Sequence, residues 1–252
     1  MSDAAHVAAY AESHLPLAGA ALTDEYYYSS PTLCIIDAVY SIGVRYEGVQ
    51  AVVRRYCERF KVVRLRHMRG ALPPKELQEP LSSLCTRIEE LGPDRMSVEV
   101  FANRQRTSTR SGILKAEAVG HFANALRSHG IEYFQDVATP LPNAALEQAI
   151  TQIPGQASGI ALRYFWMLAG SDDLIKPDRM ILRFLQHALG RDVQVSEAQR
   201  ILSGAAAILR ERYPALSPRL LDYKIWESQR RVAQQSVRGD APASRVRPQP
   251  KR

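Results

Sequence analysis

The chain has 252 residues, of which 46% are hydrophobic and 23% charged, and it carries a formal net charge of +7. This length can bury one sizeable core or two small ones, and 14 Gly with 15 Pro exclude a fibrous or low-complexity chain. No apolar run approaches the roughly 18 residues that cross a bilayer. The N-terminal stretch MSDAAHVAAYAESH lacks the pattern of a secretory signal. We therefore expect a soluble cytoplasmic protein that makes no contact with a membrane.

Three cysteines, Cys34, Cys57 and Cys85, are scattered without CxxC spacing. An odd number in a chain without an export signal predicts free thiols in a reducing compartment. Three thiols cannot complete a four-cysteine zinc or iron–sulfur site. Mixed ligation with one of the six histidines is open in principle, but no local spacing favours it. We expect neither a metal nor another cofactor.

Helical periodicity runs through most of the chain, and the alternation typical of strands is nearly absent. Apolar residues recur at i, i+3, i+4 and i+7 in five stripes, which lie within residues 49–60, 77–91, 119–126, 181–188 and 198–209. Glycines and prolines predict breaks at residues 70–74, 92–93, 130, 140–142, 170 and 190. The pattern predicts an all-α protein of about ten helices with short connections.

Basic residues gather in three places. The first is the helix and loop of residues 54–69, and the second is the loop NRQRTSTR, which contains Arg104, Arg106 and Arg110. The third is the stretch from Gln229 to Arg252, where seven basic residues stand against Asp240 alone. Each is suited to contact with phosphate, and for each the alternative is a solvated surface, which is the favoured interpretation of residues 54–69 taken alone. The composition of the last stretch predicts a disordered basic tail at residues 233–252.

The stretch IPGQASGIALRYFWMLAG, Ile153 to Gly170, predicts a Pro-Gly turn that leads directly into one buried helix. Backbone N–H groups at a helix N-terminus lack intrahelical partners, and the helix dipole places partial positive charge there. Such a turn can bind a phosphate, and glycine permits close approach to the backbone. An ordinary corner between two helices has the same sequence, so the turn alone does not decide.

The order of the surrounding residues resembles the helix–hairpin–helix superfamily of DNA glycosylases. In that family a Leu-Pro-Gly-x-Gly hairpin enters an apolar helix, and Val-Asp or Pro-Asp opens the next helix. Here Pro154, Gly155, Gln156, Ala157, Ser158 and Gly159 occupy the hairpin, and Pro177-Asp178 follows. Three weaker similarities extend the resemblance over about residues 31–228: Leu33 to Val53, Gly112 to Glu117 and Leu221 to Trp226.

The resemblance implies two helical domains with a cleft between them. We expect the first domain at residues 33–171, and the second at residues 1–32 together with 172–232. Asp178 is the expected catalytic carboxylate, although Asp is also a favourable helix N-cap. Arg45 or Tyr46 is expected to insert into the vacated base stack, and the three tyrosines Tyr26 to Tyr28 to serve mainly in the core.

Two departures from the family pattern bear on the chemistry. Ala157 replaces the second hairpin glycine, and Gly159 stands where bifunctional members carry the lysine that forms a Schiff base. Lys176 is a possible substitute for that amine. We therefore expect a monomeric, monofunctional glycosylase that flips a damaged or modified base out of double-stranded DNA and hydrolyses its N-glycosidic bond. The alternatives are a non-catalytic DNA-binding protein and, for the same chemistry, bacterial defence against phage DNA instead of repair.

Overall fold

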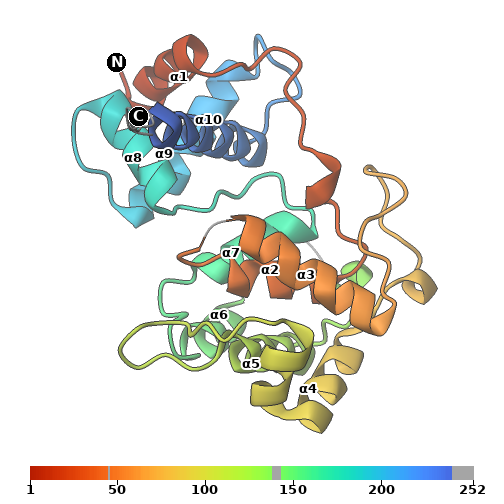
Figure 1. Cartoon of the computed structure of the whole chain (residues 1–252). Helices are drawn as coiled ribbons and strands as arrows, with labels where there is room; N and C mark the ends of the chain where they lie inside the picture. The colour runs from red at the N-terminus through yellow and green to blue at the C-terminus, as the bar shows by residue number, and fades with distance from the viewer. Residues whose placement is uncertain (45, 138–142, 240–252) are drawn as a thin grey trace, which may run out of the picture.

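The computed structural model describes residues 1–44, 46–137 and 143–239. Within these ranges the protein consists of ten α-helices and four short 3₁₀ or π segments, with isolated β-bridges but no β-strand (Figure 1). The all-α prediction is therefore confirmed. Arg45 and the predicted break at residues 140–142 lie outside the described residues.

The helices pack in two sets (Figure 1). In the first set α2 contacts α3, α5 and α7, while α5 also packs against α4 and α6. In the second set α1 packs against α8 and α9, and both of these contact α10. The first set contains α2 (Pro31–Tyr40), α3 (Tyr46–Phe60), α4 (Leu81–Arg95), α5 (Lys115–Ser128), α6 (Ala144–Thr151) and α7 (Ile160–Ala169). The second contains α1 (Asp3–His14), α8 (Arg179–Leu189), α9 (Val195–Leu209) and α10 (Pro218–Gly239).

Helix α2 is the centre of the first set, because all ten of its residues are buried. A helix that is buried on every side must have neighbours all round it. Its C-terminal end is closed by Lys115, whose Nζ donates to the carbonyl oxygens of Tyr40 at 3.0 Å and Ile42 at 2.8 Å. Burial lowers the pKa of Lys115 to about 8. The lysine in the Gly112 to Glu117 stretch thus caps a helix through orphan carbonyl groups.

Several helix boundaries differ from the prediction or refine it. Gly92 has a φ of +74° and kinks α4 where a break was predicted, but the helix resumes from Pro93 and continues into a π segment, Met96–Val100. Helix α7 begins only at Ile160, because Gly159 has a φ of +67° and ends the preceding turn. Helix α10 runs to Gly239, so residues 233–239 of the predicted tail are helical.

Three further observations concern the described residues as a whole. Their helices include none that is long and apolar enough to cross a membrane. Among them no three or more His, Cys, Asp or Glu side chains gather where a metal ion could be held. Cys34, Cys57 and Cys85 are buried free thiols.

Candidate functional site

Residues 152–159 join α6 to α7 in a tight turn. Two backbone hydrogen bonds of 2.9 Å stabilise the turn, from Gln156 N to Ile153 O and from Gly159 N to Gln156 O. Gly155 has a φ of +83°, a conformation that side chains other than glycine's rarely adopt. Pro154, Gly155, Ala157 and Ser158 are exposed, whereas Gln156 and Gly159 are buried.

The turn presents backbone donors to the solvent. The N–H groups of Gly155, Ala157 and Ser158 have no acceptor anywhere in residues 1–44, 46–137 or 143–239. Free amides that precede a helix N-terminus attract an anion, and the dipole of α7 adds to that attraction. The predicted hairpin therefore has three backbone donors without a partner among the described residues.

The basic loop that contains Arg104, Arg106 and Arg110 packs directly against this turn. A Cβ atom added to Gly155 would lie 2.5 Å from the Cβ of Thr107, so the two segments touch where glycine has no side chain. Two backbone hydrogen bonds of 2.9 Å join the two ends of the loop, from Thr107 N to Ile113 O and from Lys115 N to Gln105 O. The hairpin and the basic loop, which the sequence analysis identified separately, are thus in contact.

The three arginines of this loop differ in their contacts. Arg106 donates to the carbonyl of Gly112 at 2.7 Å, and Arg104 pairs with Asp94 at 3.2 Å on the surface. Arg110 is exposed and makes no hydrogen bond or ion pair within the described part of the chain. Arg110 is therefore the arginine of the loop that a phosphate could engage without competition.

Asp178 is the N-cap of α8. Its Oδ1 accepts from Met180 N at 2.8 Å and from Ile181 N at 3.3 Å. Its Oδ2 has no hydrogen-bond partner among the residues that the structure describes, and the side chain is half-buried. The sequence left open whether Asp178 caps a helix or performs chemistry. The geometry permits both, since the cap uses one carboxylate oxygen and leaves the other.

Lys176 connects the segment before Asp178 to both sets of helices. Its Nζ donates to Ser41 Oγ at 2.9 Å and lies 3.9 Å from the centre of the Tyr164 ring. Its backbone N–H donates to Asp222 Oδ2 at 2.7 Å. Burial lowers the pKa of Lys176, and the nearby carboxylates of Asp178, Asp37 and Asp222 oppose that effect. The amine is thus engaged in packing between α2 and α7.

Two buried carboxyl groups near Lys176 were not singled out from the sequence. Asp37 is fully buried in α2, where Tyr28 Oη donates to its Oδ2 at 2.8 Å, and burial raises its pKa to about 6. Asp222 is buried in α10, and burial also raises its pKa, to about 8. The available signal was an aspartate inside the apolar run LCIIDAVY, because a charge there must be paired or neutral.

Aromatic side chains gather where α3 meets α10. The ring of Tyr46 lies 5.8 Å from Tyr26 and 5.3 Å from Trp226, so it packs inward among other rings. The Tyr46 hydroxyl and Gln229 Oε1 are buried and find no hydrogen-bond partner in the described ranges, while Gln229 Nε2 donates to Met180 O at 2.9 Å. Of the three predicted core tyrosines, Tyr26 and Tyr28 are buried.

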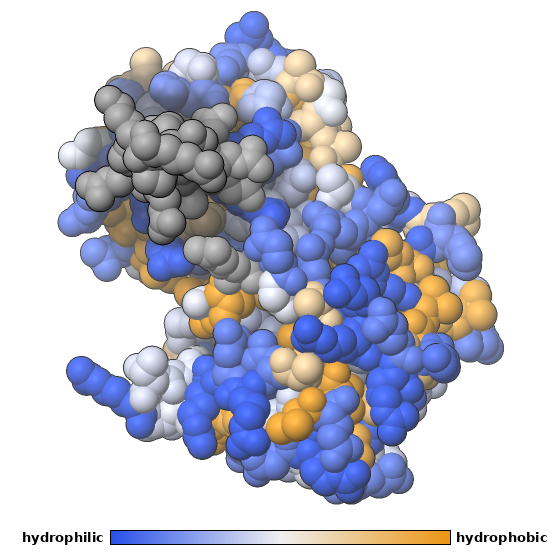
Figure 2. Space-filling model, viewed as in Figure 1, coloured by the Kyte–Doolittle hydropathy of each residue, from blue (hydrophilic) through white to orange (hydrophobic). Residues whose placement is uncertain are grey.

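The surface is hollowed between the two sets of helices on the face shown in Figure 2. The loop of residues 103–114 and the turn of residues 152–159 lie at the same side of the molecule, below this hollow (Figure 1). Asp178 opens α8 in the second set. The predicted site residues therefore come from both sets.

A family model matches residues 5–230. The chain belongs to the family described as a domain of unknown function, DUF8548. The match takes in all of α2 to α9, and with them the turn, the basic loop and Asp178. No curated protein and no solved structure matches the chain.

Proposed function

We propose that this protein is a monofunctional DNA N-glycosylase, which excises a damaged or modified base from double-stranded DNA and leaves an abasic site. The observation that carries the proposal is the state of Asp178: two backbone N–H groups fix one carboxylate oxygen, and the other has no hydrogen-bond partner among the described residues. The turn with its free amides, the neighbouring basic loop and the resemblance to helix–hairpin–helix glycosylases support it. On this proposal the two sets of helices are the two expected domains.

In the proposed reaction the free amides of Gly155, Ala157 and Ser158 bind a phosphate of the strand that carries the target base. The base must leave the stack before its glycosidic bond is accessible. Cleavage of that bond develops positive charge on C1′ and the ring oxygen of the sugar. The carboxylate of Asp178 stabilises this charge and orients the attacking water.

The flipped base would lie between α3 and α10. Tyr46 Oη in α3 and Gln229 Oε1 in α10 are each buried without a hydrogen-bond partner in the described structure, and a buried polar group without a partner is costly. A base could form hydrogen bonds with these atoms only after the groups that enclose them move apart. Gln229 also contacts Met180, two residues after Asp178, so a base at this place keeps its sugar near the carboxylate.

Strand cleavage is not expected to accompany base release. Gly159 has no amine, and the Lys176 amine already binds Ser41 and the Tyr164 ring. A Schiff base needs a free amine that reaches the sugar. The product should therefore be an intact strand with an abasic site, which breaks only after alkali.

The test is release of free base from duplexes that carry a panel of modified bases, including DNA from phages with modified bases. Mass spectrometry identifies the base, and alkali reveals the abasic site. Asp178→Asn should abolish release while the duplex is still bound. Release at the wild-type rate by this variant would remove Asp178 from the chemistry, and no release from any substrate would overturn the proposal.

A second candidate is a DNA-binding protein without catalytic activity. The methyl group of Ala157 on the exposed side of the turn favours it, because it limits approach of a phosphate to the backbone. Such a protein would retard duplex DNA with a steep salt dependence and never release a base.

The panel of modified duplexes also separates a role in repair from a role in defence, by the identity of the released base.

A further inference from the structure

Residues 61–77, which follow α3 and are called the 61–77 loop below, expose several large apolar side chains. Four of them are well exposed: Val63 at 56%, Met68 at 67%, Leu72 at 43% and Leu77 at 60%. Apart from Met1, the rest of the described chain has three others: Val98, Val195 and Ile208. Figure 2 shows apolar side chains gathered at the right edge of the molecule, where this loop lies. Single exposed apolar residues need no explanation, whereas a group of them marks an interaction site.

The 61–77 loop is attached to the protein near both of its ends. Near its start Arg66 N donates to Tyr27 O at 2.9 Å, and near its end Lys75 forms an ion pair with Asp136 at 3.1 Å. The exposed apolar side chains are therefore presented by a loop that other segments hold in place. A surface that is ordered before binding loses less conformational freedom when a partner docks.

Positive charge accompanies these apolar side chains. The 61–77 loop contains one acidic residue, Glu76, and five basic ones: Lys61, Arg64, Arg66, Arg69 and Lys75. The last two of the five pair with Asp24 and Asp136. The first three form no ion pair within residues 1–44, 46–137 and 143–239. The loop therefore attracts carboxylates and repels a second copy of itself.

A partner that matches this surface must combine negative charge with apolar side chains. DNA supplies the charge, but its phosphates gain nothing from exposed Met and Leu side chains. The loop of residues 103–114, which contacts the turn proposed to bind DNA, also extends to the opposite side of the view from the 61–77 loop (Figure 1). Segments that bind membrane surfaces typically insert Trp or Phe, and residues 61–77 contain no aromatic Trp, Tyr or Phe. An acidic protein segment with apolar side chains meets both requirements.

We propose that the 61–77 loop is the docking site for an acidic segment of another protein. The apolar side chains of that segment pack on the four exposed apolar side chains of the loop, and its carboxylates pair with the three unpaired basic residues. Apolar contacts provide most of the affinity, and the charges select the partner and speed its approach. The proposal depends neither on base excision nor on DNA binding, because it uses none of the residues assigned to them.

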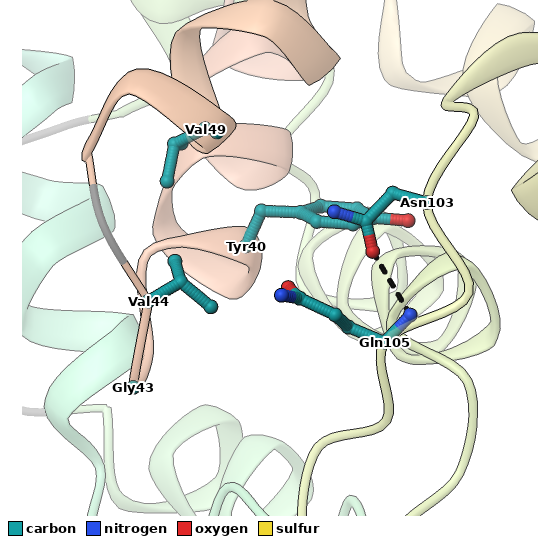
Figure 3. Close-up of a pocket in the computed structure, with 7 residues that line it drawn as sticks. Tyr40, Gly43, Val44, Val49, Asn103 and Gln105 are labelled. Atoms are coloured by element: carbon teal, nitrogen blue, oxygen red, sulfur yellow. Dashed lines mark hydrogen bonds between the residues drawn. The ribbon is translucent and has the colours of Figure 1, made fainter. Parts of the chain in front are cut away.

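A pocket in the first set of helices is another place where an apolar side chain could insert. Its volume is about 300 Å³, and it lies between the end of α2, the start of α3 and the loop that contains Asn103 and Gln105 (Figure 3). No residue of the 61–77 loop lines it. Gly48 lines it, and a Cβ atom added there meets no atom within 4 Å. Gly48→Leu therefore narrows the pocket without a clash at its Cβ and serves as a control.

The probe is a library of random dodecapeptides displayed on phage and selected against the full chain at ~0.1 M salt. We expect the enriched peptides to carry net negative charge and at least two large apolar residues. Fluorescence anisotropy of the synthetic peptides then measures their dissociation constants. An increase to ~1 M salt should weaken binding, because salt screens charges at the surface.

Two double variants connect the binding to the apolar side chains. Met68→Ser combined with Leu77→Ser should weaken the selected peptides by ~10-fold or more, since a few buried apolar anchors carry most of the affinity of an interface. Val98→Ser combined with Ile208→Ser makes the same change at exposed positions outside the loop and should leave the affinity unchanged. All four side chains are exposed, so both double variants should melt like the wild type.

The charges have a matched pair of variants as well. Arg64→Gln should weaken the selected peptides and reduce the salt dependence of their affinity. Arg163→Gln, at a half-buried arginine of α7 that has no ion pair in the described chain, should change neither. Gly48→Leu should also leave the affinity unchanged.

The proposal is overturned if acidic, apolar peptides are not enriched, or if they bind the wild type and the Met68/Leu77 variant equally. Binding that only Gly48→Leu removes places the peptide in the pocket and also overturns it. Two further measurements test other occupants: affinity for duplex DNA, and co-sedimentation with vesicles of equal parts phosphatidylglycerol and phosphatidylcholine. Both should be the same for the wild type and the Met68/Leu77 variant. A loss in either assigns the loop to DNA or to a membrane instead.

Discussion

Asp178 has a structural and a proposed chemical role, and substitutions can separate them. Asp178→Asn keeps an oxygen that can accept from Met180 N and Ile181 N, as Oδ1 does now at 2.8 and 3.3 Å. Asp178→Ala removes it. If the carboxylate performs the chemistry, both variants lose activity; if it only caps α8, activity follows stability.

The expected magnitudes differ enough to be measured. Asn and Asp are equally good N-caps, so Asp178→Asn loses mainly the charge at the helix dipole, about 0.3–1 kcal/mol. Asp178→Ala loses the cap as well, typically about 1 kcal/mol more. In a chain of this length 1 kcal/mol shifts the melting temperature by about 2–4 °C. Loss of an electrostatic or general-base group lowers the rate by about 100-fold or more.

Thermal denaturation and single-turnover base release with saturating enzyme provide the two measurements. Asn143→Ala is the matched control, since Asn143 caps α6 through its Oδ1 and has no proposed chemical role. We expect both alanine variants to melt lower, but only the Asp178 variants to lose excision. The reasoning fails if Asp178→Asn excises normally, or if activity falls in proportion to melting temperature across all three variants.

Three further predictions follow from the structure. Between pH 3.8 and about 6 the Asp37 carboxyl binds more protons in the folded than in the unfolded protein, so the free energy of unfolding should fall by about 3 kcal/mol as the pH rises through this window. Denaturant titrations of Asp37→Asn should lack this fall, and a pH profile like that of the wild type would contradict the prediction. Gly155→Ala should cost about 1–3 kcal/mol for its φ of +83° and weaken DNA binding through the Thr107 contact, whereas Gly130→Ala, with a φ of +80° and open space, should lower stability alone. Deletion of residues 240–252 should flatten the salt dependence of DNA affinity by about 0.9 per lost phosphate contact; an identical slope would show that the tail does not bind DNA.

The spacing of apolar residues and the positions of glycines predicted several helices and one helix break correctly. The apolar stripes of α3, α5 and α9 and the break at Gly130 follow from backbone sterics and burial of one face. The start of α7 was predicted too early, because the left-handed Gly159 interrupts a run that is apolar enough to be helical throughout. The helical state of residues 233–239 was also missed, since composition alone does not reveal continuation of a packed helix.

Composition and periodicity by themselves determined that this protein is helical and where the apolar stripes of α3, α5 and α9 lie, because each depends on neighbours within a few residues. Only the tertiary structure decided that Thr107 meets Gly155, that Lys176 binds Ser41, 135 residues away, and that Asp222 holds the backbone of Lys176 across 46 residues. Such contacts depend on how α2, α7 and α10 pack together. Packing is set by the summed burial of whole helices, and no short stretch of sequence carries that information.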